Sequence, residues 1–188
     1  MSAANTYRGG TVLKSGTLVV DNAQALGLGD VVVAGGVLRA DPQPINVKGN
    51  YTQNAGGTLQ LQVAGAKPGQ YDFLNVGGNA ALGGTLQLIS LGFQPKAGNQ
   101  LTLISTGGVV SGRFAQFVDP FAIGPGSLTV ELVYGPNSVL LEFLNSVINF
   151  ASFALTPNQL AAANLLDAVQ LDPRAVNLIS FLDKGAFC

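Results

Sequence analysis

One phrase occurs twice in this sequence, as Gly56-Gly57-Thr58-Leu59-Gln60-Leu61 and again as Gly83-Gly84-Thr85-Leu86-Gln87-Leu88. Shorter versions precede it in Gly9-Gly10-Thr11-Val12-Leu13, Ser15-Gly16-Thr17-Leu18 and Gly35-Gly36-Val37-Leu38. The glycines at positions 16, 36, 57 and 84, each followed by Thr or Val and then Leu, are 20, 21 and 27 residues apart. A recurrence of about 20 residues is the length of one solenoid coil, whose short strands pair with the same strands of the neighbouring coils.

The residue types of this phrase suit such a coil. Thr, Val and Leu fit the pleated faces of strands, and the period-two alternation places Leu59, Leu61 and Val63 on one face, which we expect to be the interior. Glycine tolerates positive φ without steric cost, as a tight corner requires. We expect the corners to be formed by Gly10, Gly16, Gly36, Gly57 and Gly84. The alternative is an ordinary β-sandwich with glycine-rich turns, although a sandwich does not repeat one phrase at coil spacing.

The composition excludes several classes of function but does not identify one. Glycine accounts for 25 of the 188 residues (25/188, about 13%), whereas average proteins contain about 7%. Charged residues account for 10%, whereas average proteins contain about 25%. Nine basic residues against ten acidic ones leave no electrostatic footprint for a nucleic-acid backbone. The absence of His removes the commonest general base and the commonest metal ligand. We therefore expect no nucleic-acid partner, no metal, no cofactor and no catalytic residues.

Three features invite a chemical interpretation. Glu131 and Glu142, the only glutamates, lie in apolar runs on either side of a turn and could form a glycosidase-like carboxylate pair. The alternation of each run instead predicts that both carboxylates point outward into solvent. Gly27-Leu28-Gly29-Asp30 is similar to a phosphate loop but lacks the full glycine fingerprint, so we interpret it as a corner. Cys188 is the single cysteine and forms no internal disulfide.

Residues 97–155 differ in pattern from residues 1–96, which we assign to coils. A strand is expected at 100–105, and two apolar runs between 128 and 143 flank the turn Gly135-Pro136-Asn137, which is typical of a hairpin. Most of the Phe residues fall between Phe93 and Phe153. Because the ends of a solenoid expose unpaired strand edges, we interpret this aromatic-rich hairpin as a cap. The expected core of this cap is Phe114, Phe117, Tyr134 and Phe143.

The last segment, 156–188, is predicted to be helical. Thr156 as N-cap, Pro157 at the first helical position and Gln159 three residues after the cap form a capping box. Asp172-Pro173 repeats the start signal for a second short helix. One face of the first helix would carry Leu160, Ala163, Leu166 and Val169.

Several of these phrases resemble one known family. Residues 5–27, from Asn5-Thr6-Tyr7-Arg8-Gly9-Gly10-Thr11 to Ala25-Leu26-Gly27, are similar to the passenger-associated transport repeat of bacterial autotransporters. Residues 49–53, 71–76 and 128–143 resemble the C-terminal part of such passengers, and residues 151–168 resemble the segment that leads toward the translocator. The resemblance implies a right-handed parallel β-helix ending in a β-hairpin cap, often called the autochaperone, followed by a short helical segment. It also implies export through a C-terminal outer-membrane barrel threaded by a helix.

On this resemblance, the chain is expected to be a non-enzymatic segment of a surface-displayed passenger in type V secretion. Its partner would be the translocator barrel of the parent protein, and its location the bacterial cell surface, attached to the outer membrane. The sequence departs from the family pattern by showing no signal peptide and by ending at Cys188, where a barrel should begin. The alternatives are a free-standing β-solenoid adhesin for host surfaces or carbohydrate and a fibre subunit that associates end to end. A polysaccharide lyase is the least favoured.

Overall fold

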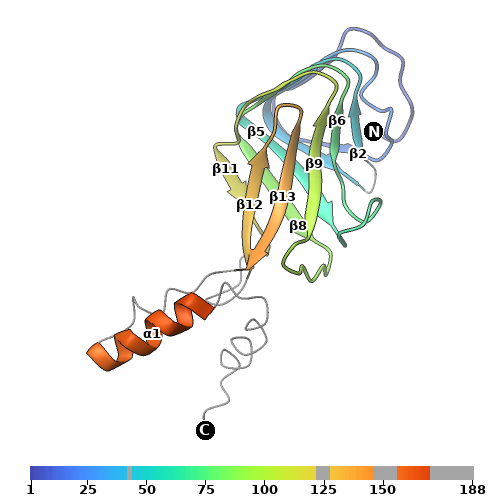
Figure 1. The fold of residues 1–188 in the computed structure, drawn as a ribbon. Coiled ribbons are helices and arrows are strands. Elements are labelled where there is room, and N and C mark those ends of the chain that lie inside the picture. The colour runs from blue at the N-terminus through green and yellow to red at the C-terminus, as the bar shows by residue number, and fades with distance from the viewer. Residues whose placement is uncertain (42–43, 122–127, 146–155, 170–188) are drawn as a thin grey trace. The chain divides into compact units, whose positions relative to one another are not determined.

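The computed structural model describes residues 1–41, 44–121, 128–145 and 156–169 (Figure 1). These residues are mostly β, with strands that are largely parallel and one short helix, α1 (Pro157–Val169), as expected for an all-β chain. The chain divides into two compact units, and the described residues of the first are 1–41, 44–121 and 130–144. Both sheets belong mainly to this first unit, and α1 belongs to the second. The second predicted helix, after Asp172, lies outside the described residues.

The first sheet has eight strands, and every pair in it is parallel. Two of its strands are long because each continues through a Gly-Gly pair. β3 pairs along one edge with both β1 and β2, and β5 pairs along one edge with both β7 and β8. The eight strands are β1 (Thr11–Leu13), β2 (Thr17–Val20), β3 (Val31–Ala40), β5 (Tyr51–Val63), β7 (Ala80–Leu82), β8 (Thr85–Ser90), β10 (Val110–Gly112) and β11 (Gln116–Val118).

The second sheet has five strands, in the order β12-β13-β9-β6-β4. β4, β6 and β9 pair in parallel, whereas β13 pairs antiparallel with β9. Along the chain, a strand of the first sheet is followed each time by a strand of the second, from β3 to β4, from β5 to β6 and from β8 to β9. The strand bounds are β4 (Ile45–Val47), β6 (Leu74–Val76), β9 (Gln100–Thr106), β12 (Leu128–Tyr134) and β13 (Ser138–Asn145).

The strand registers place the repeated phrases directly on one another. One column of paired residues runs through five strands and consists of Leu18, Leu38, Leu59, Leu86 and Phe117. Leu38, Leu59 and Leu86 have no exposed surface. The prediction that Leu59, Leu61 and Val63 form an interior face is confirmed, because all three are fully buried.

The glycines expected to form corners occupy two kinds of environment. Gly10, Gly16, Gly36 and Gly84 have positive φ, as expected for tight corners. At Gly84, where φ is 60°, a Cβ would also lie only 2.6 Å from the carbonyl oxygen of Asn54. Gly57 differs from the expectation, because its φ is not in the left-handed region. A Cβ at Gly57 would lie 2.7 Å from the carbonyl oxygen of Val33, so glycine is needed there for close approach of the neighbouring strand.

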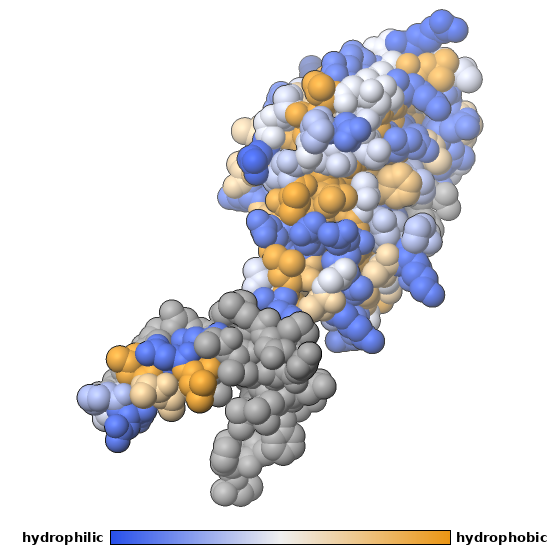
Figure 2. Space-filling model, in the orientation of Figure 1, coloured by the Kyte–Doolittle hydropathy of each residue, from blue (hydrophilic) through white to orange (hydrophobic). Residues whose placement is uncertain are grey.

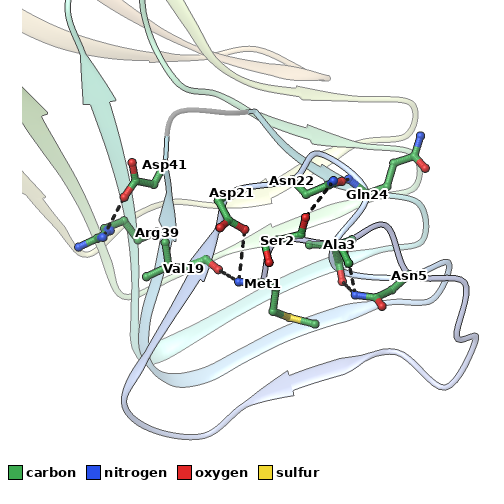
Figure 3. Close-up of polar contacts among 11 residues, drawn as sticks. Met1, Ser2, Ala3, Asn5, Val19, Asp21, Asn22, Gln24, Arg39 and Asp41 are labelled. Atoms are coloured by element: carbon green, nitrogen blue, oxygen red, sulfur yellow. Dashed lines mark hydrogen bonds and ion pairs between the residues drawn. The ribbon is translucent and has the colours of Figure 1, made fainter.

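The first residues of the chain continue the same stacking, since they bond to residues 18 and 20 positions further along (Figure 3). The Met1 ammonium donates to the carbonyl oxygen of Val19 at 2.5 Å and lies 3.5 Å from the Asp21 carboxylate. The side-chain amide of Asn5 donates to the carbonyl oxygen of Ala25 at 2.7 Å. The segment that precedes β1 thus runs beside the end of β2 and the loop that precedes β3.

Parallel pairing does not stop at residue 97, where the sequence pattern changes. β9, β10 and β11 all lie beyond that point and continue the parallel arrangement of β6, β7 and β8. Antiparallel pairing within the second sheet begins only with β13. The division into coils at 1–96, a cap at 97–155 and a helical segment at 156–188 stays a prediction, and strand pairing crosses its first boundary.

We predict that Leu59→Ala destabilises the protein by about 2–5 kcal/mol, because it opens a cavity in the middle of the buried leucine column. Thr58→Ala, one residue away on the outward face, is the matched control and should cost less than about 1 kcal/mol. Urea unfolding followed by circular dichroism measures both. Equal losses for the two variants would contradict the assignment of Leu59 to the interior column.

Candidate functional site

The end of the two sheets that carries β12 and β13 differs from the rest of the described structure, because β13 pairs antiparallel with β9. The hairpin turn is closed by the backbone N–H of Gly135, which donates to Ser138 O at 2.8 Å. The turn bonds to both sheets: Thr106 N, at the end of β9, donates to Asn137 O at 2.9 Å, and Val110 N, at the start of β10, donates to Pro136 O at 2.8 Å. We call this hairpin, residues 128–145, the cap hairpin (Figure 1).

The cap hairpin covers the edge that β9 would otherwise expose. β13 pairs with β9 from Ser138 opposite Ser105 to Glu142 opposite Gln100, with an irregularity between Val139 and Leu140. Val139, Leu141 and Phe143 face inward and are fully buried. An antiparallel strand with an irregularity at this position ends the parallel series, because a further parallel strand would need the edge that β13 occupies.

Three phenylalanines form the apolar centre of this end. Phe93, Phe121 and Phe143 contact one another edge to face, with ring centroids 5.3–5.8 Å apart. Phe121 and Phe143 are buried. The turn before Phe121 is fixed by Asp119, whose carboxylate accepts a hydrogen bond from Phe121 N at 2.7 Å. Partial burial raises the pKa of Asp119, and the hydrogen bond from Phe121 acts in the opposite direction.

Tyr134 makes a second attachment between the cap hairpin and the first sheet. Its hydroxyl accepts a hydrogen bond from Phe114 N at 3.3 Å, and the guanidinium of Arg113 lies 4.5 Å from the centre of its ring. Burial raises the pKa of Tyr134, while the bond to Phe114 and the charge of Arg113 oppose that rise. This cation–π contact ties the last residue of β12 to the segment between β10 and β11.

The four residues expected to form one cap core therefore lie in different places. Phe143 belongs to the phenylalanine cluster, Tyr134 contacts Arg113 and Phe114, and Phe117 stands on Leu86 in the leucine column. The sequence interpretation missed Phe93 and Phe121 as partners of Phe143. The only available signal was the enrichment of Phe after residue 93, because their contacts depend on long-range pairing.

A polar ladder fixes the corner at which each repeat enters the first sheet. Asp30 Oδ1 accepts from Asn50 N at 2.7 Å, Asn50 Oδ1 accepts from Asn79 N at 2.9 Å, and Asn79 Oδ1 accepts from Val109 N at 2.9 Å. Each side chain thus satisfies a backbone N–H of the next repeat. Asp30 ends the segment Gly27-Leu28-Gly29-Asp30, where Gly27 has a φ of 71°, so this segment forms a corner.

Glu131, Glu142 and Asp72 are each engaged in structure or exposed. Glu131 is exposed, and Glu142 accepts a hydrogen bond from the Gln100 side chain at 2.8 Å. Asp72 is buried, and its carboxylate accepts from Gln62 N at 2.9 Å, which holds the returning chain against β5. Burial raises the pKa of Asp72, the Gln62 bond lowers it, and nearby Asp41 raises it further. Among the described residues, no three His, Cys, Asp or Glu side chains are grouped to hold a metal ion.

α1 begins with the expected cap geometry. Thr156 Oγ1 accepts from Gln159 N at 3.3 Å, Thr156 O accepts from Leu160 N at 2.9 Å, and Pro157 is the first helical residue. Leu160 is exposed and Ala163 is buried, whereas the side chains of Leu166 and Val169 lie outside the described set. Within the described part of the chain, no helix is long and apolar enough to cross a membrane.

A scan against models of known protein families and a search of curated proteins return no match for this chain. Its function has to be inferred from its own residues and their geometry. The cap hairpin is the candidate site, because it joins both sheets and ends the parallel series.

We predict that Phe143→Ala destabilises the protein by about 3–5 kcal/mol, since it removes a fully buried ring that contacts two others. Val118→Ala is the control, because Val118 lies on a strand of the same end but is 45% exposed. Thermal unfolding reports both variants. A small loss for Phe143→Ala, similar to that of the control, would show that the cluster contributes little.

Proposed function

We propose that this chain is the C-terminal part of a surface-displayed autotransporter passenger. In this proposal the two sheets are faces of a right-handed β-solenoid stalk, and the cap hairpin closes the stalk and nucleates its folding. The observation that carries the proposal is the combination of a parallel, in-register stack with one end closed by an antiparallel hairpin.

The solenoid interpretation is supported by the order of the strands. The phrases at 16, 36, 57 and 84 lead into strands that pair consecutively, and the chain visits the second sheet between the later ones. Each such passage is a crossover between parallel strands of one sheet. Crossovers of this kind are right-handed in roughly 98% of cases, which favours a right-handed coil.

The role of the cap hairpin as folding nucleus is supported by where its contacts fall. A stack of coils gains stability mainly from contacts between neighbouring coils, so folding propagates from whichever unit forms first. The cap hairpin forms by a two-residue turn, Pro136-Asn137, and therefore loses little entropy on loop closure. It also buries the phenylalanine cluster, which makes its end the richest in large aromatic contacts among the described residues.

Export gives this nucleus a function. A chain that emerges at the cell surface with this end first would fold its cap hairpin outside the membrane. The folded end could not slide back through a narrow pore, and each added coil would draw more chain outward. The translocator barrel of the parent protein is the partner in this proposal, and the cell surface is the location.

The fibre alternative is disfavoured by the same geometry. End-to-end growth needs a parallel edge at both ends of the stack, but β13 occupies the edge of β9 in the antiparallel sense. The turn of the cap hairpin also occupies Val110 N at the start of β10. Adhesion to carbohydrate or host surfaces stays an alternative without a specific observation in its favour.

We predict that a cap-hairpin variant impairs surface display more than a variant of equal stability in the leucine column. The C-terminal end of the full chain is fused to an outer-membrane barrel, and display is measured by surface antibody labelling. Phe143→Ala should reduce display several-fold, because the nucleus is lost, whereas Leu38→Ala in the buried column should reduce it little. Urea unfolding of both variants first establishes that their losses of stability are equal. Equal display of both variants would overturn the proposal.

A further inference from the structure

β12 is the last strand of the second sheet, and among the described strands it pairs only with β13. In Figure 1 it lies beside β13, which separates it from β9, and Figure 2 shows hydrophobic and hydrophilic residues intermingled on the face seen in the same view. The N–H of Gly135 points to β13 through its bond to Ser138. Because backbone groups alternate between the two edges of a strand, the backbone groups of Val133 and Glu131 also face β13. Those of Leu132 and Val130 lie on the side away from β13, where no described strand pairs.

A strand edge that is unpaired among the described strands and carries apolar side chains is a template for pairing with another chain. β12 reads Leu-Thr-Val-Glu-Leu-Val-Tyr, and Leu128, Val130, Leu132 and Tyr134 share one face by alternation. Its single charged residue, Glu131, lies at the midpoint of the strand. Glu131 is exposed and makes no hydrogen bond or ion pair among the described residues.

We propose that the β12 edge is self-complementary and that the charge of Glu131 is what keeps two copies of this chain apart. In an antiparallel pairing of β12 with β12 of a second copy, centred on residue 131, all seven residues overlap. Leu128 then lies opposite Tyr134, and Val130 lies opposite Leu132, which are favourable cross-strand pairs. The two Glu131 side chains face each other at the two-fold axis, where like charges are unfavourable.

This pairing would be isologous and closed, because both copies use the same edge. It differs from end-to-end stacking in giving a dimer rather than a filament. It is also independent of the proposed role in export, since it concerns the side of the cap hairpin and not its folding.

The test measures association by sedimentation of the full chain over a range of concentrations. Wild type should be monomeric, while Glu131→Gln and Glu131→Val should form dimers, with an association constant raised about tenfold or more. Glu131→Lys should remain monomeric by itself, because two lysines repel as two glutamates do. Glu142→Gln is the control and should stay monomeric, since Glu142 lies on β13, which is paired on the side facing β9.

The most discriminating experiment mixes wild type with Glu131→Lys in equal amounts. A one-to-one heterodimer is expected, because the lysine then faces the glutamate across the axis. Circular dichroism confirms that each variant is folded. Monomeric Glu131→Gln and Glu131→Val, a mixture that fails to associate, or filaments in place of dimers would each overturn the proposal.

Discussion

The stacking of one short apolar phrase on copies of itself determines how the other parts of the fold are placed. Leu38, Leu59 and Leu86 lie in one buried column, and the glycines that precede them let the backbones of neighbouring repeats approach closely. A side chain at Gly57 would collide with Val33, and a side chain at Gly84 would collide with the carbonyl groups of the neighbouring strand. The column thus fixes both the spacing of the strands and the register of everything attached to them.

The polar ladder and the cap hairpin follow from that register. Once the columns are aligned, Asp30, Asn50 and Asn79 stand above one another at the corner, and each accepts a bond from the repeat that follows. The same alignment leaves a parallel edge on β9 that has to be covered. The cap hairpin covers it with β13 and is secured to the first sheet through Val110 and Tyr134. The last free edge among the described strands of the second sheet on this side is β12, where Glu131 stands.

The sequence was informative wherever the determining contacts were local or periodic. The Gly-Thr-Leu phrase predicted the parallel stack and its interior face, and the Thr156-Pro157-Asn158-Gln159 signal predicted the start of α1. The sequence did not predict contacts between repeats where the length of the repeat varied. Asp30 and Asn79 are 20 and 29 residues from Asn50, so the polar ladder has no constant period. The phenylalanine cluster was missed for a related reason, because Phe93 meets Phe143 only through the pairing of β13 with β9.

Native-state hydrogen exchange followed by mass spectrometry would show whether the cap hairpin is the most stable unit. We expect the amides of β9 and β13 to exchange last, and protection to fall steadily from there toward β1 and β2. Such a gradient is expected of a stack that folds from the cap hairpin and frays at the opposite end. Uniform protection, or protection that is greatest in β1 and β2, would contradict the proposed role of the cap hairpin as folding nucleus.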